Sequence, residues 1–523
     1  MTHSTFAHFA ARHTALWFAV LVFAALISSC RKDFSAEPSP GRLKFSKDTV
    51  YLDTVFTNIG SSTYNLKVYN TENYTISIPV IRLERGESSG YRLNVDGVPG
   101  KYFEDVEILP KDSIYIFVET TINYDEVTDP LYEDRILFDA GEKEQDVHLV
   151  TLVQDAHFLF PGRENGVIET VELEGFDEPV TGRYLTDDEL TFTPEKPYVI
   201  YGYMVVGDAD DNPKTLTMLP GTRVHFHAHS GLIVNAHSSL HILGELNGEG
   251  QPPSGVVLEG DRLEPDFAEV PGQWDFILLR NGSTGHIIRN ATIKNAKAAL
   301  VLEGMGDGVT PVLQLHNTQL YNHSVYGILA FYTHIYGTNV VTGNIGRSAF
   351  AGLLGGKYEF IHCTFTDYWT TGRELPVIWL SNNLRNAGGQ VEAVGDLMQA
   401  DFTNCIIYGS RNVEWALDRA EGAEFQFHFD SCMMKFYDPT NQYDDPLYDL
   451  SDTSYYQNVI IEGEPDFEDV SNNRFIIGEE SACIGAASPP GTAAVPEDIL
   501  GKPRANPADT GAYEHVVFED EDE

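Results

Sequence analysis

The chain has 523 residues, 42% of them hydrophobic, with 34 Lys and Arg against 78 Asp and Glu and a formal net charge of −44. A length of this order predicts about three domains, or fewer where one of them is a long repeat array. A surface so acidic repels polyanions, so we expect no nucleic-acid partner, and a heparin-like or pectate-like partner would need a local basic patch or a bound cation.

An apolar run at the N-terminus covers residues 16–27 and leads into Ser28, Ser29 and Cys30. The run has the length of a signal-peptide core and is too short to cross a bilayer as a helix. Small residues followed by a single Cys resemble the lipobox of bacterial lipoproteins. That resemblance implies a signal peptide over residues 1–29, lipidation of Cys30 and attachment to the membrane through this N-terminal lipid. A plain secretory leader with a Cys near its cleavage point is the alternative.

The residues after Cys30 bear on the destination of such a lipoprotein. In that family an Asp directly after the Cys tends to retain the protein at the inner membrane, and Arg31 stands there in this chain. Lys32 and Asp33 partly resemble a signal for export to the cell surface, although Phe34 replaces its second acid. The resemblance implies a lipid anchor in the outer membrane, on the periplasmic or the cell-surface face. Residues 30–40 then form the lipidated Cys and a tether rich in Ser and Pro.

Short alternating strands fill residues 41–155, for example at 64–69 and 113–118. Alternation with a period of two and no helical stretch predicts a β-sandwich. Residues 56–60 and 108–113 resemble the immunoglobulin-like modules of the abnormal-spindle and hydin type. That resemblance implies a spacer or a protein-binding unit.

Residues 156–215 are expected to connect this unit to a second one and to cap it, and the second unit covers residues 216–515. Within it a loose repeat recurs at intervals of about 22–27 residues, with one interval nearly twice as long. Such periods are typical of solenoids, and short strands without intervening helices select a β-solenoid. The repeat begins, in successive copies, at Asn290, Asn317, Asn339, His362, Asn404 and Ser431.

Two further motifs resemble elements of the right-handed parallel β-helix proteins. One is Pro271-Gly272-Gln273-Trp274, and the other is an Asp-x-x-Gly-x-x-Arg stretch that precedes Asp-x-Gly-Ala-Tyr-Glu near the C-terminus. The expected fold class is therefore all-β, with an N-terminal immunoglobulin-like β-sandwich followed by a right-handed parallel β-helix. Residues 516–523 are expected to form an acidic tail. The second motif consists of Asp498, Gly501, Arg504, Asp509, Gly511, Ala512, Tyr513 and Glu514.

Three cysteines occupy one position of the repeat, namely Cys363, Cys405 and Cys432. An even number of cysteines after Cys30 in an exported chain would also fit disulfides. Because buried free Cys behaves as a small hydrophobe, stacked thiols in the core are the favoured interpretation. The chain has no Cys-x-x-Cys pair, so no structural zinc site is expected.

Two sets of side chains are candidates for metal binding. His225, His227 and His229 alternate along an expected strand, so they would share one face and could hold a transition metal. The alternative is a solvent-facing strand on which His is tolerated, and alternate residues lie about 6.5–7 Å apart, which is awkward for one ion. Asp208, Asp210 and Asp211 resemble the start of a calcium loop, or an Asx-rich turn without an ion. We expect no cofactor, and Ca²⁺ is the alternative.

Function is expected from exposed aromatic side chains rather than from a catalytic motif. No set of carboxylates, His, Arg and Lys at fitting positions indicates a hydrolase or lyase, so no catalytic residue is assigned. Aromatic faces beside Asp and Asn suit glycans or protein partners outside the membrane, and the insertion over residues 436–458 is the expected binding feature. The alternatives are rings that pack loops onto the core, a polysaccharide lyase or glycoside hydrolase with an unrecognised site, and a purely structural envelope component. The aromatic candidates are Tyr368, Trp369, Trp379, Tyr443 and Tyr448.

Overall fold

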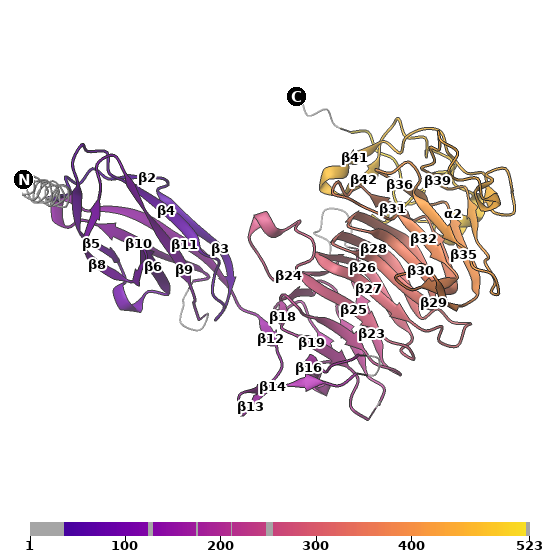
Figure 1. Cartoon of the computed structure of the whole chain (residues 1–523), viewed down its shortest axis with the longest axis horizontal. Helices are drawn as coiled ribbons and strands as arrows, with labels where there is room; N and C mark the ends of the chain where they lie inside the picture. Colours follow the sequence, from indigo (N-terminus) through magenta and orange to yellow (C-terminus); the bar gives the residue numbers. More distant parts are fainter. Residues whose placement is uncertain (1–35, 124–128, 174–175, 211, 247–254, 519–523) are drawn as a thin grey trace, which may run out of the picture. The chain divides into compact units, whose positions relative to one another are not determined.

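The computed structural model describes residues 36–123, 129–173, 176–210, 212–246 and 255–518. The described chain is all-β apart from short helical turns, which confirms the predicted class (Figure 1). It divides into two compact units, Met1–Gln154 and Asp155–Glu523. In the part of the chain that is described, no helix is both long enough and apolar enough to cross a membrane. Cys30 and residues 519–523 lie outside the described residues.

The N-terminal unit consists of two sheets around one core, in which Val50, Leu66, Ile78, Ile116 and Leu149 are fully buried. Side chains alternate along its strands, with one face buried and the other exposed, as a sheet half-covered by a core requires. The first sheet has the order β2 (Lys44–Phe45), β4 (Tyr64–Tyr69), β9 (Ser113–Thr120), β6 (Tyr91–Val95) and β7 (Val98–Gly100). The second has the order β1 (Glu37–Pro38), β5 (Ile76–Leu83), β10 (Leu131–Phe138), β11 (Gln145–Gln154) and β3 (Thr49–Phe56), with β8 (Tyr102–Ile108) beside β5.

The C-terminal unit is built from three runs of parallel strands, in which each strand pairs with the strand of the next layer of chain. One run begins β18 (Tyr198–Ile200), β21 (Arg223–Phe226), β24 (Val256–Gly260). A second begins β19 (Tyr203–Val206), β22 (Gly231–Val234), β25 (Trp274–Leu279). The third begins β20 (Thr215–Met218), β23 (Ser239–Leu243), β26 (His286–Lys294).

The same three runs continue as far as β40, and longer strands between take part in more than one run. Parallel pairing throughout means that equivalent residues of successive layers lie above one another. The continuing strands are β27 (Ala296–Glu303), β28 (Leu313–His323), β29 (Tyr326–Ile345), β30 (Ser348–Ile361), β31 (Thr364–Asp367), β32 (Ile378–Ser381), β35 (Leu397–Thr403), β36 (Ile406–Gly409), β37 (Trp415–Asp418), β38 (His428–Asp430), β39 (Met433–Met434) and β40 (Tyr456–Gln457).

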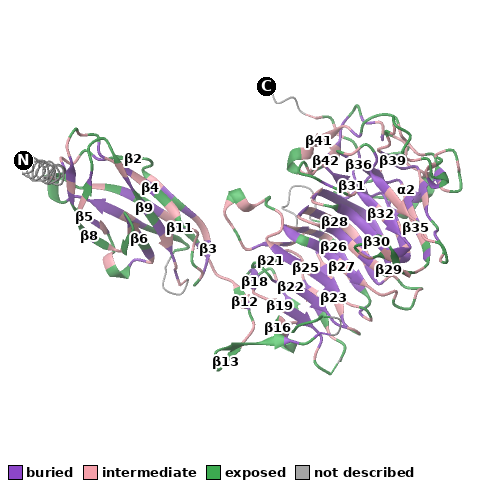
Figure 2. Cartoon of the chain, viewed as in Figure 1, coloured by how far each residue is buried: buried purple, intermediate pink, exposed green. Residues whose placement is uncertain are grey.

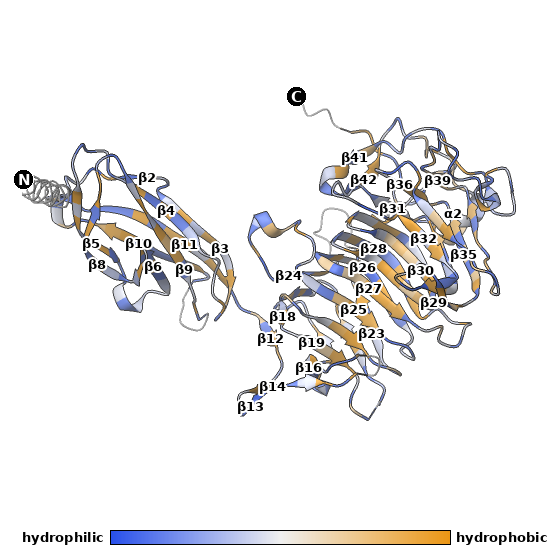
Figure 3. Ribbon diagram, viewed as in Figure 1, coloured by the Kyte–Doolittle hydropathy of each residue, from blue (hydrophilic) through white to orange (hydrophobic). Residues whose placement is uncertain are grey.

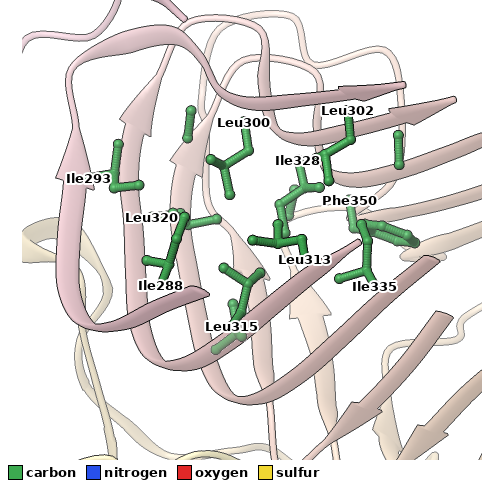
Figure 4. Close-up of a cluster of buried hydrophobic side chains, with 14 of the residues drawn as sticks. Ile288, Ile293, Leu300, Leu302, Leu313, Leu315, Leu320, Ile328, Ile335 and Phe350 are labelled. Atoms are coloured by element: carbon green, nitrogen blue, oxygen red, sulfur yellow. The ribbon is translucent and has the colours of Figure 1, made fainter. Parts of the chain in front are cut away.

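The core of the C-terminal unit lies between these runs, and its strands are both buried and apolar (Figures 2 and 3). Leucine and isoleucine side chains from all three runs point inward to one another in Figure 4. In later layers aromatic rings replace them. Phe360, Phe402, Phe429 and Tyr456 are register partners whose rings stack with centroids 5.1–5.7 Å apart. Vertical stacking of like side chains therefore follows from the parallel register.

Each predicted repeat begins at a corner with left-handed backbone. Asn290, Asn317 and Asn339 have φ of 47°, 49° and 50°, a region that Asn enters more readily than most residues. Their side chains form a ladder across three layers. The Nδ2 of Asn317 donates to Oδ1 of Asn290 at 3.0 Å, and Nδ2 of Asn339 donates to Oδ1 of Asn317 at 2.9 Å. Asparagine recurs at this position of the repeat because it tolerates positive φ and because its side-chain amide bonds the next layer.

Asn317→Ala should lower the free energy of unfolding by about 1–3 kcal/mol, because it breaks both ladder bonds and places a Cβ-bearing residue without an amide at positive φ. Asn317→Gly breaks the same bonds and relieves the backbone, so its cost should be smaller. Chemical denaturation of both variants separates the two contributions. Equal stability of the wild type and both variants would contradict a ladder that stabilises the layers.

The predicted thiol stack is confirmed for the described cysteines. Cys363, Cys405, Cys432 and Cys483 are all free and buried. The backbone N–H of Cys363 donates to Sγ of Cys405 at 3.4 Å, and that of Cys405 donates to Sγ of Cys432 at 3.4 Å. Burial raises the pKa of the Cys405 thiol, so the side chain stays neutral in the core.

The C-terminal segment crosses the outside of several layers and bonds to each. The Nη2 of Arg504 donates to Oδ1 of Asn339 at 2.8 Å, and the backbone N–H of Gly511 donates to the carbonyl of Asn404 at 2.8 Å. Thr510 Oγ1 donates to the carbonyl of Ser431 at 3.1 Å. The motif singled out near the C-terminus therefore supplies the residues that attach this segment to the layers.

Candidate functional site

A hollow of about 430 Å³ opens beside the insertion at residues 436–458, which the sequence marks as a binding feature. It lies within the C-terminal unit, between the turn that precedes β37 and the start of the insertion. Its size is in the range of small-molecule sites, and its lining mixes apolar and polar groups. The lining residues are Ser410, Arg411, Asn412, Val413, Tyr437, Asp438, Pro439, Thr440, Gln442 and Tyr443.

A buried group of charges lies directly behind this hollow. Asp367 ends β31, Arg373 lies in the following loop, and Glu414 precedes β37. The side chains of all three are at most 2% exposed. Arg373 Nη1 donates to Oε2 of Glu414 at 2.9 Å, and its Nε lies 3.5 Å from Oδ2 of Asp367. Charges taken out of water in this way persist only when they are paired.

The buried charges fix the turn that forms one wall of the hollow. Glu414 accepts the backbone N–H of Arg411 at 2.7 Å and that of Val377 at 3.1 Å. Arg411 Nη1 in turn donates to the carbonyl of Arg373 at 2.7 Å. Arg373 therefore holds both residues. Its side chain pairs with Glu414, and its carbonyl accepts the hydrogen bond that fixes the guanidinium of Arg411.

The opposite wall is the start of the insertion, which the carboxylate of Asp438 organises. Asp438 accepts the backbone N–H groups of Gln442 at 3.0 Å and Tyr443 at 2.8 Å, and these bonds lower the pKa of its carboxyl. The backbone N–H of Tyr437 donates to the carbonyl of Asn412 at 2.7 Å, so the two walls are joined. The ring of Tyr437 is 61% exposed and is the large apolar surface that the hollow offers to solvent.

The chemistry of this site suits binding better than carboxylate catalysis. Glu414 is occupied by Arg373 and two backbone N–H groups, and Asp438 by two backbone N–H groups. The Glu414 side chain is fully buried, and the backbone bonds to Asp438 lower the pKa of its carboxyl, which makes Asp438 a weak general base. What remains is two tyrosine rings, a fixed guanidinium, amides and hydroxyls, which can stack against and hydrogen-bond a hydroxylated ligand.

Burial raises the pKa of the Asp367 carboxyl to about 6, from an ordinary value of 3.8, while Arg373 acts in the opposite direction. A folded pKa above the unfolded one means that protonation stabilises the fold. That contribution is complete below pH 3.8 and is lost as the pH rises through about 6. The absence of a hydrogen-bond partner for Oδ2 in the described chain agrees with this direction.

Asp367→Asn should remove this pH dependence. The free energy of unfolding of the wild type minus that of the variant should fall by on the order of 2–3 kcal/mol between about pH 4 and pH 7. Denaturant titrations of both proteins across that interval measure the difference. A difference that stays constant with pH would contradict the raised pKa.

The predicted aromatic residues are half-buried and pack loops onto the unit. Tyr368 contacts the rings of Phe467 and Phe475. Trp379 packs against a cluster that contains Ala351 and Leu353.

The last two aromatic candidates, Tyr443 and Tyr448, lie within the insertion. Tyr448 Oη accepts the backbone N–H of Leu417 at 3.0 Å, and Tyr443 lies against Tyr448 with ring centroids 5.0 Å apart. Trp369 is tied to its own loop by a bond from Nε1 to the carbonyl of Thr371. Of the five predicted rings, only Tyr443 lines the hollow.

The expectation that three histidines share one strand face is wrong. Strand β21 ends at Phe226, so of the three only His225 lies in it. His225 is 3% exposed, and burial lowers its pKa. His227 bonds Asp261 at 2.7 Å, which raises the pKa of the imidazole, and His229 lies in a turn with φ of 58°. In the described part of the chain, no three His, Cys, Asp or Glu side chains are grouped to hold a metal ion.

The predicted calcium loop forms an Asx turn. Oδ1 of Asp208 accepts the backbone N–H groups of Asp210 at 3.0 Å and Asn212 at 2.9 Å. Oδ2 accepts from the amide of Asn212 at 2.8 Å. Asp211 lies outside the described residues.

Sequence reasoning placed Tyr437 and Asp438 in the expected insertion, but it missed Arg411, which lines the hollow, and the buried residues Arg373 and Glu414, which hold its wall. Arg373 and Glu414 are 41 residues apart, and nothing in the spacing of charges indicates that they are buried together. The one available signal was the position of Asp367 at the end of a repeat strand, where a carboxylate in a core register needs a partner.

Comparisons with known proteins identify no family. No family model matches the chain, and no curated protein matches it. Among solved structures, one match is a family 123 glycoside hydrolase from Clostridium perfringens, described in connection with glycolipid glycan hydrolysis. The two chains are 11% identical, the match covers 21% of this chain and 26% of that one, and the TM-score is 0.15. A likeness of this extent carries no argument about the fold or the function of this chain.

Proposed function

We propose that this protein is a cell-envelope lipoprotein, anchored in the outer membrane through Cys30, whose C-terminal unit binds a glycan in the hollow beside Tyr437. The anchor follows from the resemblance of residues 16–30 to a lipobox. The ligand lies outside the membrane, on the periplasmic or the cell-surface side. A protein partner at the same hollow is the alternative occupant.

The proposed architecture is an immunoglobulin-like β-sandwich followed by a right-handed parallel β-helix. Two sheets on one core support the first assignment. Three runs of parallel strands, with left-handed corners at Asn290, Asn317 and Asn339, support the second. The right hand of the winding is taken from the resemblance to that family. Rigid stacked layers of this kind commonly carry binding loops on one side.

The observation that carries the proposed function is the exposed ring of Tyr437 over a hollow whose walls are fixed by buried charges. Pre-ordered walls reduce the entropy lost when a ligand binds. A flat apolar ring beside hydroxyl, amide and guanidinium groups matches the mixed apolar and hydroxylated surface of a sugar.

A glycan array tests the proposal with the protein that begins at Arg31, read for retention and for released products. Tyr437→Ala should weaken retention roughly tenfold, because loss of a ring buried against the ligand costs on the order of 1.5 kcal/mol. Tyr51→Ala is the matched control, since Tyr51 is 68% exposed in the other unit.

The two readouts separate the alternatives. Retention of no glycan by the wild type would refute the glycan-binding form of the proposal. Release of shortened products would instead support a lyase or a glycoside hydrolase. If Tyr51→Ala and Tyr437→Ala weakened glycan retention equally, the hollow beside Tyr437 would not be the binding site.

A further inference from the structure

The outer face of one sheet in the N-terminal unit carries aromatic and basic side chains together. We call Lys44, Lys67, Tyr69, Tyr115 and Phe117 the aromatic–basic face. Lys44 lies opposite Tyr69 in the pairing of β2 with β4, and Lys67 lies opposite Tyr115 in the pairing of β4 with β9. Residues directly opposite each other point to the same side of a sheet, so these side chains share one surface.

The two rings on β9 form a parallel pair that is open to solvent. Tyr115 is 47% and Phe117 41% exposed, and their ring centroids are 6.1 Å apart with an interplanar angle of 12°. Lys67 Nζ lies 5.1 Å from the ring centroid of Tyr115 and 5.4 Å from that of Tyr69. Large rings exposed side by side on a sheet are a feature of binding surfaces.

A hollow of about 590 Å³ lies at the β2 end of the same face. Two lysines line it, and Lys111 Nζ donates to the carbonyl of Thr71 at 2.6 Å. The rim is ordered by the buried amide of Asn70, which donates to the carbonyls of Ile108 and Leu109 at 3.0 Å. The lining residues are Lys44, Phe45, Ser46, Tyr69, Asn70, Thr71, Lys111 and Asp112.

The sign of the charge on this face is opposite to that of the chain as a whole. The net charge is −44, yet Lys67 lies over the rings of Tyr69 and Tyr115, Lys44 and Lys111 line the hollow, and Asp112 is its acidic residue. At the far end of the face Glu119 is paired with Arg92 at 3.6 Å. A polyanion that the rest of the surface repels would therefore meet attraction here.

We propose that the aromatic–basic face and its hollow bind a polysaccharide that carries carboxylates. Sugar rings lie on Tyr115 and Phe117, and carboxylates meet the ammonium groups of Lys44, Lys67 and Lys111. The site goes beyond the proposed function because it lies in the other unit and selects its ligand by charge. The acidic composition of the chain requires a local basic patch or a bound cation for a polyanionic partner, and this face is such a patch.

Affinity electrophoresis of the chain from Arg31 tests this site, with polygalacturonate in the gel and its methyl-esterified form as the neutral match. Polygalacturonate should retard the protein and the ester should not, and added salt should reduce the retardation. Lys67→Gln should weaken retardation roughly fivefold, since it removes the cation that lies over the rings of Tyr69 and Tyr115. Tyr115→Ala should weaken it by a similar factor.

Two controls keep the outcome specific. Lys502→Gln changes the net charge equally but lies in the other unit, and Tyr51→Ala removes an exposed ring from β3 on the other sheet of the N-terminal unit, so neither should alter the retardation. Equal retardation by the ester, no retardation at all, or an equal effect of Lys502→Gln would overturn the proposal. Binding to anionic phospholipid vesicles without binding to polygalacturonate would also overturn it, because a membrane would then be the occupant.

Discussion

Replacing Arg373 with alanine should lower the free energy of unfolding of the C-terminal unit by about 3–5 kcal/mol, because it leaves two buried carboxylates without their cation. The side chains of Asp367 and Glu414 are both 0% exposed, so water cannot replace the guanidinium without opening the core. Denaturant unfolding followed by tryptophan fluorescence, to which the fully buried Trp274 and Trp415 of this unit contribute, measures the loss.

The matched control for this substitution is Arg385→Ala. Arg385 pairs with Asp418 at 2.7 Å in the same unit, but the two side chains are 39% and 28% exposed. A pair open to solvent contributes about 0–1 kcal/mol. If the two variants unfold at the same denaturant concentration, the buried charges do not support the hollow as described.

Replacing Arg504 with alanine should cost a similar amount, about 3–5 kcal/mol. The Arg504 side chain is 0% exposed and pairs with Glu514 at 3.2 Å, while its Nε donates to the carbonyl of Val495 at 3.1 Å. Its loss also breaks the bond to Asn339, which joins the C-terminal segment to the layers. Denaturation should show the lower stability, and limited proteolysis should show faster cleavage after residue 486.

Lys502→Ala serves as the control for Arg504, because Lys502 is exposed in the same segment. Its backbone N–H bonds Asp498 at 2.9 Å, and this bond survives the substitution. We expect its stability to lie within about 0.5 kcal/mol of the wild type. Unchanged proteolysis in Arg504→Ala would mean that other contacts attach the segment.

The sequence predicts the layered β-structure well because its signals are local and repeated. Asn317 indicates a left-handed corner because asparagine adopts positive φ more readily than most residues. Asparagine one repeat earlier and one repeat later supports the same spacing. The stacked thiols at Cys363, Cys405 and Cys432 were predictable for the same reason, since parallel register places equivalent residues above one another.

The site could not be predicted in the same way because it depends on contacts between loops. Two of its hydrogen bonds join residues outside the repeat. Arg373 donates to the carboxylate of Glu414, and the backbone N–H of Tyr437 donates to the carbonyl of Asn412. His225 and His227 show the opposite failure. Alternation suggested one continuous strand, but the chain turns after Phe226, where Ser230 Oγ donates to the carbonyl of His227. The strand therefore ends at Phe226, although the alternation of His with apolar residues continues to His229.

Hydrogen exchange with and without a retained glycan tests the central claim, that the hollow beside Tyr437 is the binding site. Amides at residues 410–413 and 437–443 should exchange more slowly when the glycan is bound, because the ligand orders both walls. Strands β26 and β28, which lie in the same unit and do not line the hollow, provide the internal reference. Slower exchange in both segments, which requires roughly tenfold more glycan in Tyr437→Ala, is the predicted result. Protection confined to other segments, or protection with the same glycan dependence in Tyr437→Ala, would contradict the account.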